Sequence, residues 1–204
     1  MAVIECAKGE DEAALVRIVR QFLNALSWRE QATIQEMDVT YGPPLRHSTN
    51  IPGNSTRPDF DSDDLPDPSD AGAQLAIALY REGLTLQRPY IAYSFLSYFK
   101  VINICFKYGR DQKHWINSNW QHVTHPDAVE RLQEILAQGH SIGEYLFESG
   151  RCAVAHAFGH PIVDPDSIQD QQRISRDCPV IRALAALLIQ QRWQIPAPRW
   201  GKPV

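Results

Sequence analysis

Hydrophobic side chains recur at helical spacing through most of this chain. Between residues 10 and 28 they follow the i, i+3, i+4 pattern of one helical face, with polar residues such as Arg17 on the other. A second helix is expected to begin at Asp70, a residue type that favours the N-cap. The apolar run from Pro89 to Phe106 has few polar sides, which is typical of the central helix of a bundle.

The pattern continues toward the C-terminus with interruptions. A polar stretch containing Trp115 and Trp120 is expected to connect two helices, and Pro126 suits the first turn of the next one. Residues 141–158 predict a further helical region, which two internal glycines, each costing about 1 kcal/mol, are expected to divide. A last helix is expected to begin at Pro179, so residues 69–193 form the predicted helical core.

Two segments near the N-terminus depart from the helical pattern. Residues 32–41 change to alternating apolar and polar positions, which predicts a short strand. Residues 42–70 are rich in Pro and Asp and have almost no apolar periodicity, so we expect a flexible acidic loop. The predicted fold is a single, mainly α domain over residues 1–204, a helical bundle with a small N-terminal β element.

Composition narrows the classes of function. The 24 acidic and 20 basic residues give a formal net charge of -4, so bulk positive charge cannot drive nucleic-acid binding, and any RNA contact must be local. The four cysteines are far apart and predict free thiols. The N-terminus does not resemble a signal peptide, and the apolar run ending at Phe106 is too short to span a bilayer. We therefore expect a cytoplasmic protein with no membrane partner.

Candidate chemistry lies in one late helical segment, where Arg151 and His156 are five positions apart. Three alanines, at 153, 155 and 157, surround the histidine and would let a second helix approach closely. In an ideal helix five residues leave two side chains roughly 140° apart, so only the long arginine could reach the other side chain. A two-fold homodimer is the simplest source of the second helix, and it would gather two arginines and two histidines around one cleft.

These residue types suit phosphodiester chemistry. An imidazole titrates near neutral pH, so His156 could take the proton of an RNA 2′-hydroxyl or give one to the leaving oxygen. The guanidinium of Arg151 could bind the phosphate and stabilise the charge that develops on it. Neither role needs a metal ion or another cofactor.

An R-x4-H motif near the end of an all-helical domain resembles the HEPN superfamily, many of whose members are dimeric, metal-independent RNA endonucleases. A more specific likeness is to methylamine-utilisation proteins of the MauJ type. Several segments carry it: Leu26–Trp28, Tyr80–Gly83, Phe95–Ile104, Gly150–Ala157 and Arg173–Ile174. The resemblance implies a HEPN-like fold in which Arg151 and His156 are the catalytic pair.

Other readings remain open. Active HEPN members commonly have a polar residue directly after the arginine, where this chain has Cys152, so a catalytically silent module that binds RNA, a nucleotide or a partner protein is the alternative function. His156 and His160 also have the i, i+4 spacing of a zinc pair, although Gly159 would turn His160 out of the helix. The aromatic run Tyr90, Tyr93, Phe95, Tyr98, Phe99 could stack on bases, but its helical spacing favours core packing.

Overall fold

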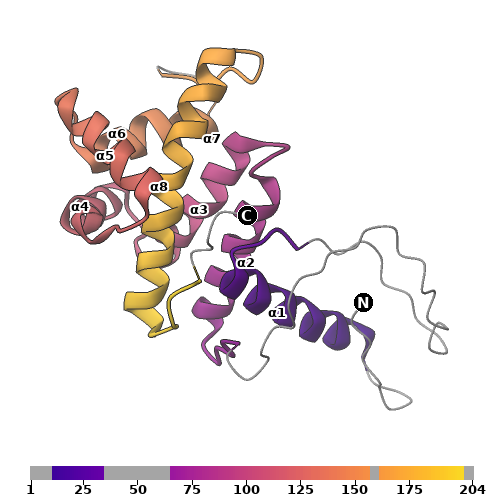
Figure 1. The fold of residues 1–204 in the computed structure, drawn as a ribbon. Coiled ribbons are helices and arrows are strands. Elements are labelled where there is room, and N and C mark those ends of the chain that lie inside the picture. The colour runs from indigo at the N-terminus through magenta and orange to yellow at the C-terminus, as the bar shows by residue number, and fades with distance from the viewer. Residues whose placement is uncertain (1–10, 35–64, 157–160, 200–204) are drawn as a thin grey trace.

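The computed structural model describes residues 11–34, 65–156 and 161–199, and within them the chain is mainly helical, with no strand (Figure 1). Its elements are α1 (Glu12–Glu30), α2 (Ala71–Leu86), α3 (Ile91–Cys105), α4 (Gly109–Asn119), a 3-10 turn (Trp120–His122), α5 (Pro126–Ala137), α6 (Ile142–Tyr145), a π-helical turn (Leu146–Cys152), α7 (Ala153–Ala155) and α8 (Ile168–Trp193). The predicted mainly α class is confirmed.

The N-terminal predictions are tested only in part. The predicted helix over residues 10–28 corresponds to α1, and Asp70 caps α2 as expected by accepting a hydrogen bond from the Ala73 backbone at 2.8 Å. Residues 32–34 have no regular secondary structure, and the rest of the expected strand lies outside the described residues. The same holds for most of the expected acidic loop, of which residues 65–70 are described and form no helix or strand.

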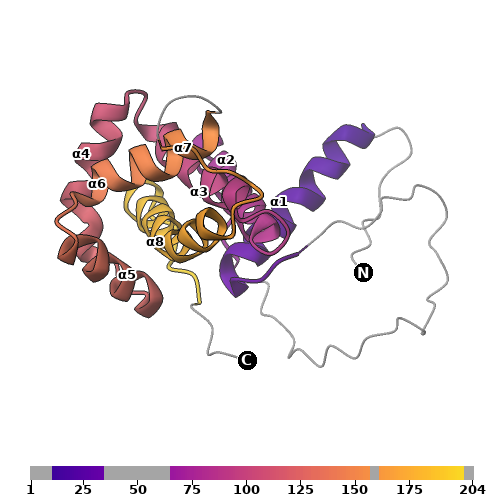
Figure 2. The same cartoon turned by 90° about the horizontal axis from the view of Figure 1, so that it is seen from above.

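The longest helix, α8, runs through the centre of the bundle. Helices α2 and α3 pack side by side and α3 lies along α8, while α5 covers another face of α8 (Figure 1). Seen from above, α1 lies outside α2 on one side of the bundle, and α4, α5 and α6 lie on the other (Figure 2). No helix among the described residues has both the length and the apolar character needed to cross a membrane.

The predicted start of the last helix at Pro179 is wrong. Helix α8 begins eleven residues earlier, at Ile168, and Pro179 lies inside it. The Ser167 hydroxyl accepts a hydrogen bond from the Asp170 backbone at 3.2 Å and so caps the true N-terminus. A proline removes one backbone donor from a helix. The helix continues because Ile174, Asp177 and Cys178 are buried on the N-terminal side of the proline and Val180 and Ile181 on the other.

The polar stretch around Trp115 is also a helix rather than the expected connection. In α4 only Gln112 and Ile116 are buried, so the apolar periodicity that would have predicted the helix is almost absent. The Gln112 amide donates a hydrogen bond to the Phe106 carbonyl at 2.7 Å and joins α4 to the end of α3.

The aromatic run at the start of α3 divides into two groups. Phe95, Tyr98 and Phe99 are fully buried, as core packing predicts. Tyr90 and Tyr93 remain 60% exposed, so the core interpretation is wrong for these two. Tyr93 lies on the side of α3 opposite Phe95, because residues two positions apart on a helix differ by about 200°. Tyr90 is the N-cap residue, just before the first turn of α3.

The C-terminal end of α1 is fixed to the core by one side chain. Gln31 ends the helix in a left-handed backbone conformation with φ of 50°. Its Oε1 accepts hydrogen bonds from the Tyr80 hydroxyl at 2.7 Å and from the Arg182 guanidinium at 2.8 Å. Residues from α1, α2 and α8 therefore meet at one amide oxygen.

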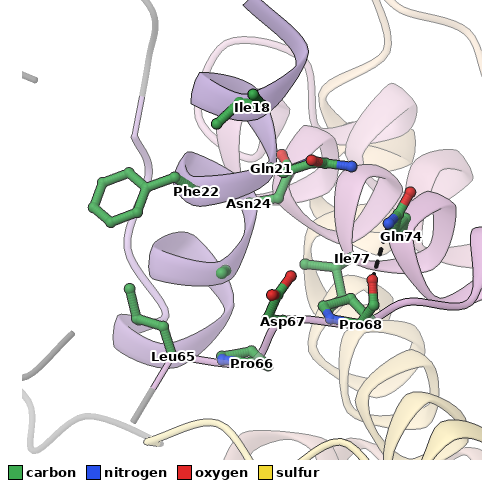
Figure 3. Close-up of a pocket in the computed structure, with 11 residues that line it drawn as sticks. Ile18, Gln21, Phe22, Asn24, Leu65, Pro66, Asp67, Pro68, Gln74 and Ile77 are labelled. Atoms are coloured by element: carbon green, nitrogen blue, oxygen red, sulfur yellow. Dashed lines mark hydrogen bonds between the residues drawn. The ribbon is translucent and has the colours of Figure 1, made fainter. Parts of the chain in front are cut away.

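A groove of about 300 Å³ lies between α1, residues 65–68 and α2. Figure 3 shows Ile18 and Phe22 of α1 on one side of it and Pro68 on the other. The Gln74 amide donates a hydrogen bond to the Pro68 carbonyl at 2.9 Å and so joins residues 65–68 to α2.

A buried ionic cluster joins α5, α6 and α8. The Asp177 carboxylate, 1% exposed, accepts hydrogen bonds from Arg131 at 2.8 Å and from the Tyr145 hydroxyl at 3.0 Å. Arg173 lies 3.9 Å from the same carboxylate. Burial raises the pKa of Asp177, and the hydrogen bond and charge of Arg131 offset only part of that rise.

We expect Arg131→Met to lower the free energy of unfolding by about 3–5 kcal/mol near neutral pH, because it leaves the buried Asp177 without its main counter-charge. The loss should shrink as the pH falls. Asp177 has a folded-state pKa above its unfolded value, so the folded protein takes up the proton first, and the penalty of the buried charge disappears as the pH drops through that raised pKa.

Urea denaturation at neutral and mildly acidic pH measures both effects. The double variant Arg131→Met/Asp177→Asn is the control, since it removes the carboxylate charge and should lose less stability than the single variant at neutral pH. A deficit that is the same at both pH values would contradict the role given to Asp177.

Candidate functional site

The segment that carries Arg151 and His156 is a helix widened at its centre. It is helical from Ile142 to Ala155, and a π-helical turn, Leu146–Cys152, interrupts the α-helical geometry. The glycines therefore do not divide this region into two pieces as expected: the helix is continuous, and its geometry changes within it. The C-terminal boundary differs from the prediction, because the helix ends at Ala155 and His156 is already extended, with φ of -126° and ψ of 136°. Gly159, the expected stop, lies outside the described residues.

Close packing explains the glycine at the fifth position of the turn, Gly150. A Cβ atom on Gly150 would lie 2.3 Å from the ring of Phe95, so only glycine allows the turn to contact α3 at this point. Arg173 of α8 donates a hydrogen bond to the Ser149 carbonyl in the same turn. Isolated π-helical turns are frequent at functional sites. Here contacts with α3 and α8 hold the turn, which includes Arg151.

The structure brings the two predicted site residues into contact. Arg151 Nη1 lies 3.3 Å from Nε2 of His156 in the same chain. The arginine reaches around the helix as expected, and the extended backbone at His156 takes the imidazole off the ideal helical path. The guanidinium also lies over the Phe147 ring, 5.6 Å from its centroid, and 3.7 Å from Cys152 Sγ.

The contact faces solvent. His156 and Ala155 are exposed and Arg151 is half-buried, whereas Ala153 is 2% exposed and packs inward. Three alanines were expected to receive a second helix. Among the described residues, Ala155 is exposed and Ala153 is not, and Ala157 lies outside the described residues.

Charge around Arg151 favours an anionic ligand. No carboxylate of the described residues lies within ion-pair distance of its guanidinium. The neighbouring acids are engaged elsewhere, because Glu144 and Glu148 lie 2.9 and 3.9 Å from Lys113. The buried Arg151 Nε also has no hydrogen-bond partner among the residues that the structure describes. A guanidinium with no carboxylate partner can bind a phosphate or carboxylate without first breaking an ion pair.

Two supporting residues were not predicted from the sequence. Phe147 lies under the Arg151 guanidinium from a position four residues earlier, a spacing that could have indicated the pair. Lys113 of α4 lies 5.3 Å from the centroid of the same ring, and no local pattern joins it to residue 151. Phe147 limits the orientations open to Arg151, and Lys113 packs on the same ring.

The zinc alternative gains no support from the described residues. No three His, Cys, Asp or Glu side chains are grouped there in a way that could hold a metal ion. His160, the proposed partner of His156, lies outside the described part of the chain.

Comparison with known proteins bears on the family. The sequence model of one family, described as methylamine utilization protein MauJ, matches residues 76–190, which is more than half of the 204-residue chain. The chain belongs to the MauJ family. No curated protein and no solved structure matches it. The MauJ region extends from α2 into α8 and contains both Arg151 and His156, whereas α1 precedes it.

The Arg151 contact predicts the tautomer of this MauJ protein's histidine. A guanidinium can only donate hydrogen bonds, so Nε2 of the neutral His156 must accept, and the ring proton must be on Nδ1. We expect ¹⁵N-detected NMR of the neutral ring to show a protonated Nδ1 in the wild type and a shift toward protonated Nε2 in Arg151→Ala. His122, exposed on another turn, serves as the internal control. Unchanged His156 nitrogen shifts in the variant would contradict the contact.

The close approach of Gly150 to α3 gives a second prediction. We expect Gly150→Ala to destabilise the protein by about 1–3 kcal/mol, because the new methyl group must displace the buried Phe95 ring. That effect outweighs the gain of up to about 1 kcal/mol that alanine brings to a helix.

A double-mutant cycle with Phe95→Leu, followed by thermal or urea unfolding, checks the mechanism. The smaller side chain should make the alanine less costly, so the double variant should lose less stability than the sum of the two single variants. Strict additivity would mean that the two residues do not compete for the same space.

Proposed function

We propose that this MauJ protein is a metal-independent RNA endonuclease of the HEPN type, with Arg151 and His156 as its catalytic pair at a homodimer interface. The observation that carries the proposal is the 3.3 Å contact between Arg151 Nη1 and His156 Nε2 on an exposed surface, where no described carboxylate pairs with the guanidinium. A proton-transfer group and a phosphate-binding group are thus already adjacent in one chain.

The pair can serve both ends of a phosphodiester cleavage. A neutral His156 accepts a proton at Nε2 from the RNA 2′-hydroxyl, and the 2′-oxygen attacks phosphorus. As the bond to the 5′-oxygen breaks, a second imidazole in the protonated form gives that oxygen its proton. The products are a 2′,3′-cyclic phosphate and a 5′-hydroxyl end. Arg151, released from the imidazole by the substrate, binds the phosphate oxygens on which charge develops.

A second copy of the chain supplies the second imidazole. One histidine cannot be both the initial base and the initial acid, and His156 follows the helix end on an exposed surface beside the exposed Ala155. A two-fold axis near this point would bring the partner copy's pair to the same phosphate. The substrate class that follows is RNA, since the mechanism requires a 2′-hydroxyl.

The alternative function is a catalytically silent module that binds RNA, a nucleotide or a partner protein. The Cys152 thiol supports this alternative. It lies 3.7 Å from the guanidinium and occupies the position directly after the arginine, where active HEPN proteins commonly have a stronger hydrogen-bonding group. Arg151 would then bind an anion without turnover.

We expect Arg151→Ala and His156→Ala each to reduce RNA cleavage by about two to four powers of ten, the usual contribution of a general acid or base, without loss of folding. Gel analysis of mixed structured RNAs incubated in EDTA measures the effect, and the wild type should remain active because no step uses a metal. Arg110→Ala and His122→Ala, which remove exposed side chains of the same types elsewhere, are the matched controls.

Mixing each inactive variant with the wild type tests the composite site. A dimer of the wild type with His156→Ala contains one imidazole instead of the two that the mechanism needs, so suppression of wild-type cleavage by an excess of this variant would show that the two chains share one site. Binding of RNA without cleavage, weakened by Arg151→Ala with a smaller dependence on salt, would support the silent module instead. Cleavage that survives in both variants, or that EDTA abolishes, would overturn the nuclease mechanism.

A further inference from the structure

A second cavity, unrelated to the Arg151 site, lies at the far end of the bundle. It has a volume of about 580 Å³ and lies between the first turn of α2, the end of α3, α4 and the last turns of α8. Phe95 of α3 contacts the π-helical turn, and Cys105 of the same helix lines this cavity. Ten helical residues separate the two, or about 15 Å along the helix. Figure 1 places α7 and the yellow end of α8 toward opposite ends of the molecule.

Three aromatic side chains form the apolar part of the cavity. Phe106 and Trp115 are stacked, with ring centroids 5.9 Å apart and planes inclined by 28°. Trp193 borders it from α8, and a Cβ atom on Gly72 would lie only 3.3 Å from the indole, so the ring contacts the first turn of α2 directly. Flat π-faces in a cavity of this size favour a planar aromatic ligand.

The uncommitted polar groups around these rings are donors. Neither the Trp115 nor the Trp193 indole nitrogen has a hydrogen-bond partner within the described residues. The exposed Arg192 guanidinium has no carboxylate within ion-pair distance in the described part of the chain. The Asp70 carboxylate also borders the cavity, but it accepts the hydrogen bond that caps α2.

Arg192 places positive charge at the cavity wall, because it lines the cavity together with Cys105. Burial raises the pKa of the Cys105 thiol, and the charge of the Arg192 guanidinium offsets part of that rise. A ligand that supplies a negative charge at this wall would complete the polar contacts.

We propose that this cavity binds a planar aromatic ring bearing one anionic group, with the ring against Phe106, Trp115 and Trp193 and the anion on Arg192. Two kinds of molecule share this chemistry, an aromatic carboxylate and a nucleoside monophosphate. The site does not depend on the proposed nuclease activity, and its ligand can be sought with the wild-type protein alone.

Isothermal titration calorimetry with two pairs of probes tests the site. Benzoate is compared with the neutral benzamide, and AMP with adenosine, so that each pair keeps its ring and differs in charge. We expect saturable binding of at least one anionic probe, about tenfold tighter than its neutral counterpart, which is the factor for one added charge-assisted contact. Saturable quenching of the fluorescence of the tryptophans that line the cavity should accompany it. Which anion binds identifies the source of the ligand.

Variants locate the bound probe. Arg192→Gln should reduce the affinity for the anion to that of the neutral probe, while Trp193→Leu should weaken both. Arg110→Gln, at an arginine exposed elsewhere, is the matched control and should change nothing. Circular dichroism confirms that each variant is folded. The proposal is overturned if neither anion binds up to millimolar concentration, if Arg192→Gln leaves the preference for the anion intact, or if Arg151→Gln rather than Arg192→Gln abolishes binding.

Discussion

The buried carboxylate of Asp177 is the interaction on which the arrangement of this protein depends. It lies near the middle of α8 and accepts hydrogen bonds from α5 through Arg131 and from α6 through Tyr145. Arg173, one turn earlier, lies near the same carboxylate and also bonds the carbonyl of Ser149 in the π-helical turn. A charge buried this deeply is tolerated only with such partners. These contacts fix three helices and the turn that contains Arg151 relative to one another.

The buried contacts of Asp177 and Arg173 also position the Arg151 site at the surface. Arg151 lies within the π-helical turn and its guanidinium packs over Phe147, so it reaches the exposed His156 without an ion pair to any described carboxylate. Rigid positioning of a cation that remains available to ligand is what recognition of a phosphate requires. The family match includes Asp177 and its partners as well as Arg151 and His156. The proposed nuclease activity uses the last two, which lie at the surface.

The elements with strong apolar periodicity could be predicted from the sequence. The predictions were wrong for elements that bury few side chains or bury polar ones. Helices α1, α3 and α5 have clear stripes or caps, but α4 buries only two side chains and was expected to be a connection. Pro179 was expected to start a helix but lies inside α8. The turn before it is supported by contacts of Asp177 with Arg131, a residue far away in the sequence, which no local pattern reveals. The R-x4-H spacing predicted Arg151 and His156 as a pair, and the structure places them in contact. The contact of Lys113 with Phe147 depends on packing between helices and has no local signature.

Gln31, the left-handed residue at the end of α1, shows that contacts extend beyond the N-terminal boundary of the family segment. Gln31 precedes the segment matched by the family, yet its amide oxygen is the shared acceptor for Tyr80 and Arg182, which both lie within that segment. A fragment trimmed to the family boundaries would leave a buried hydroxyl and a largely buried guanidinium without this acceptor. The buried hydrogen bonds of the family segment are therefore completed by the residue that ends α1, which the match does not include.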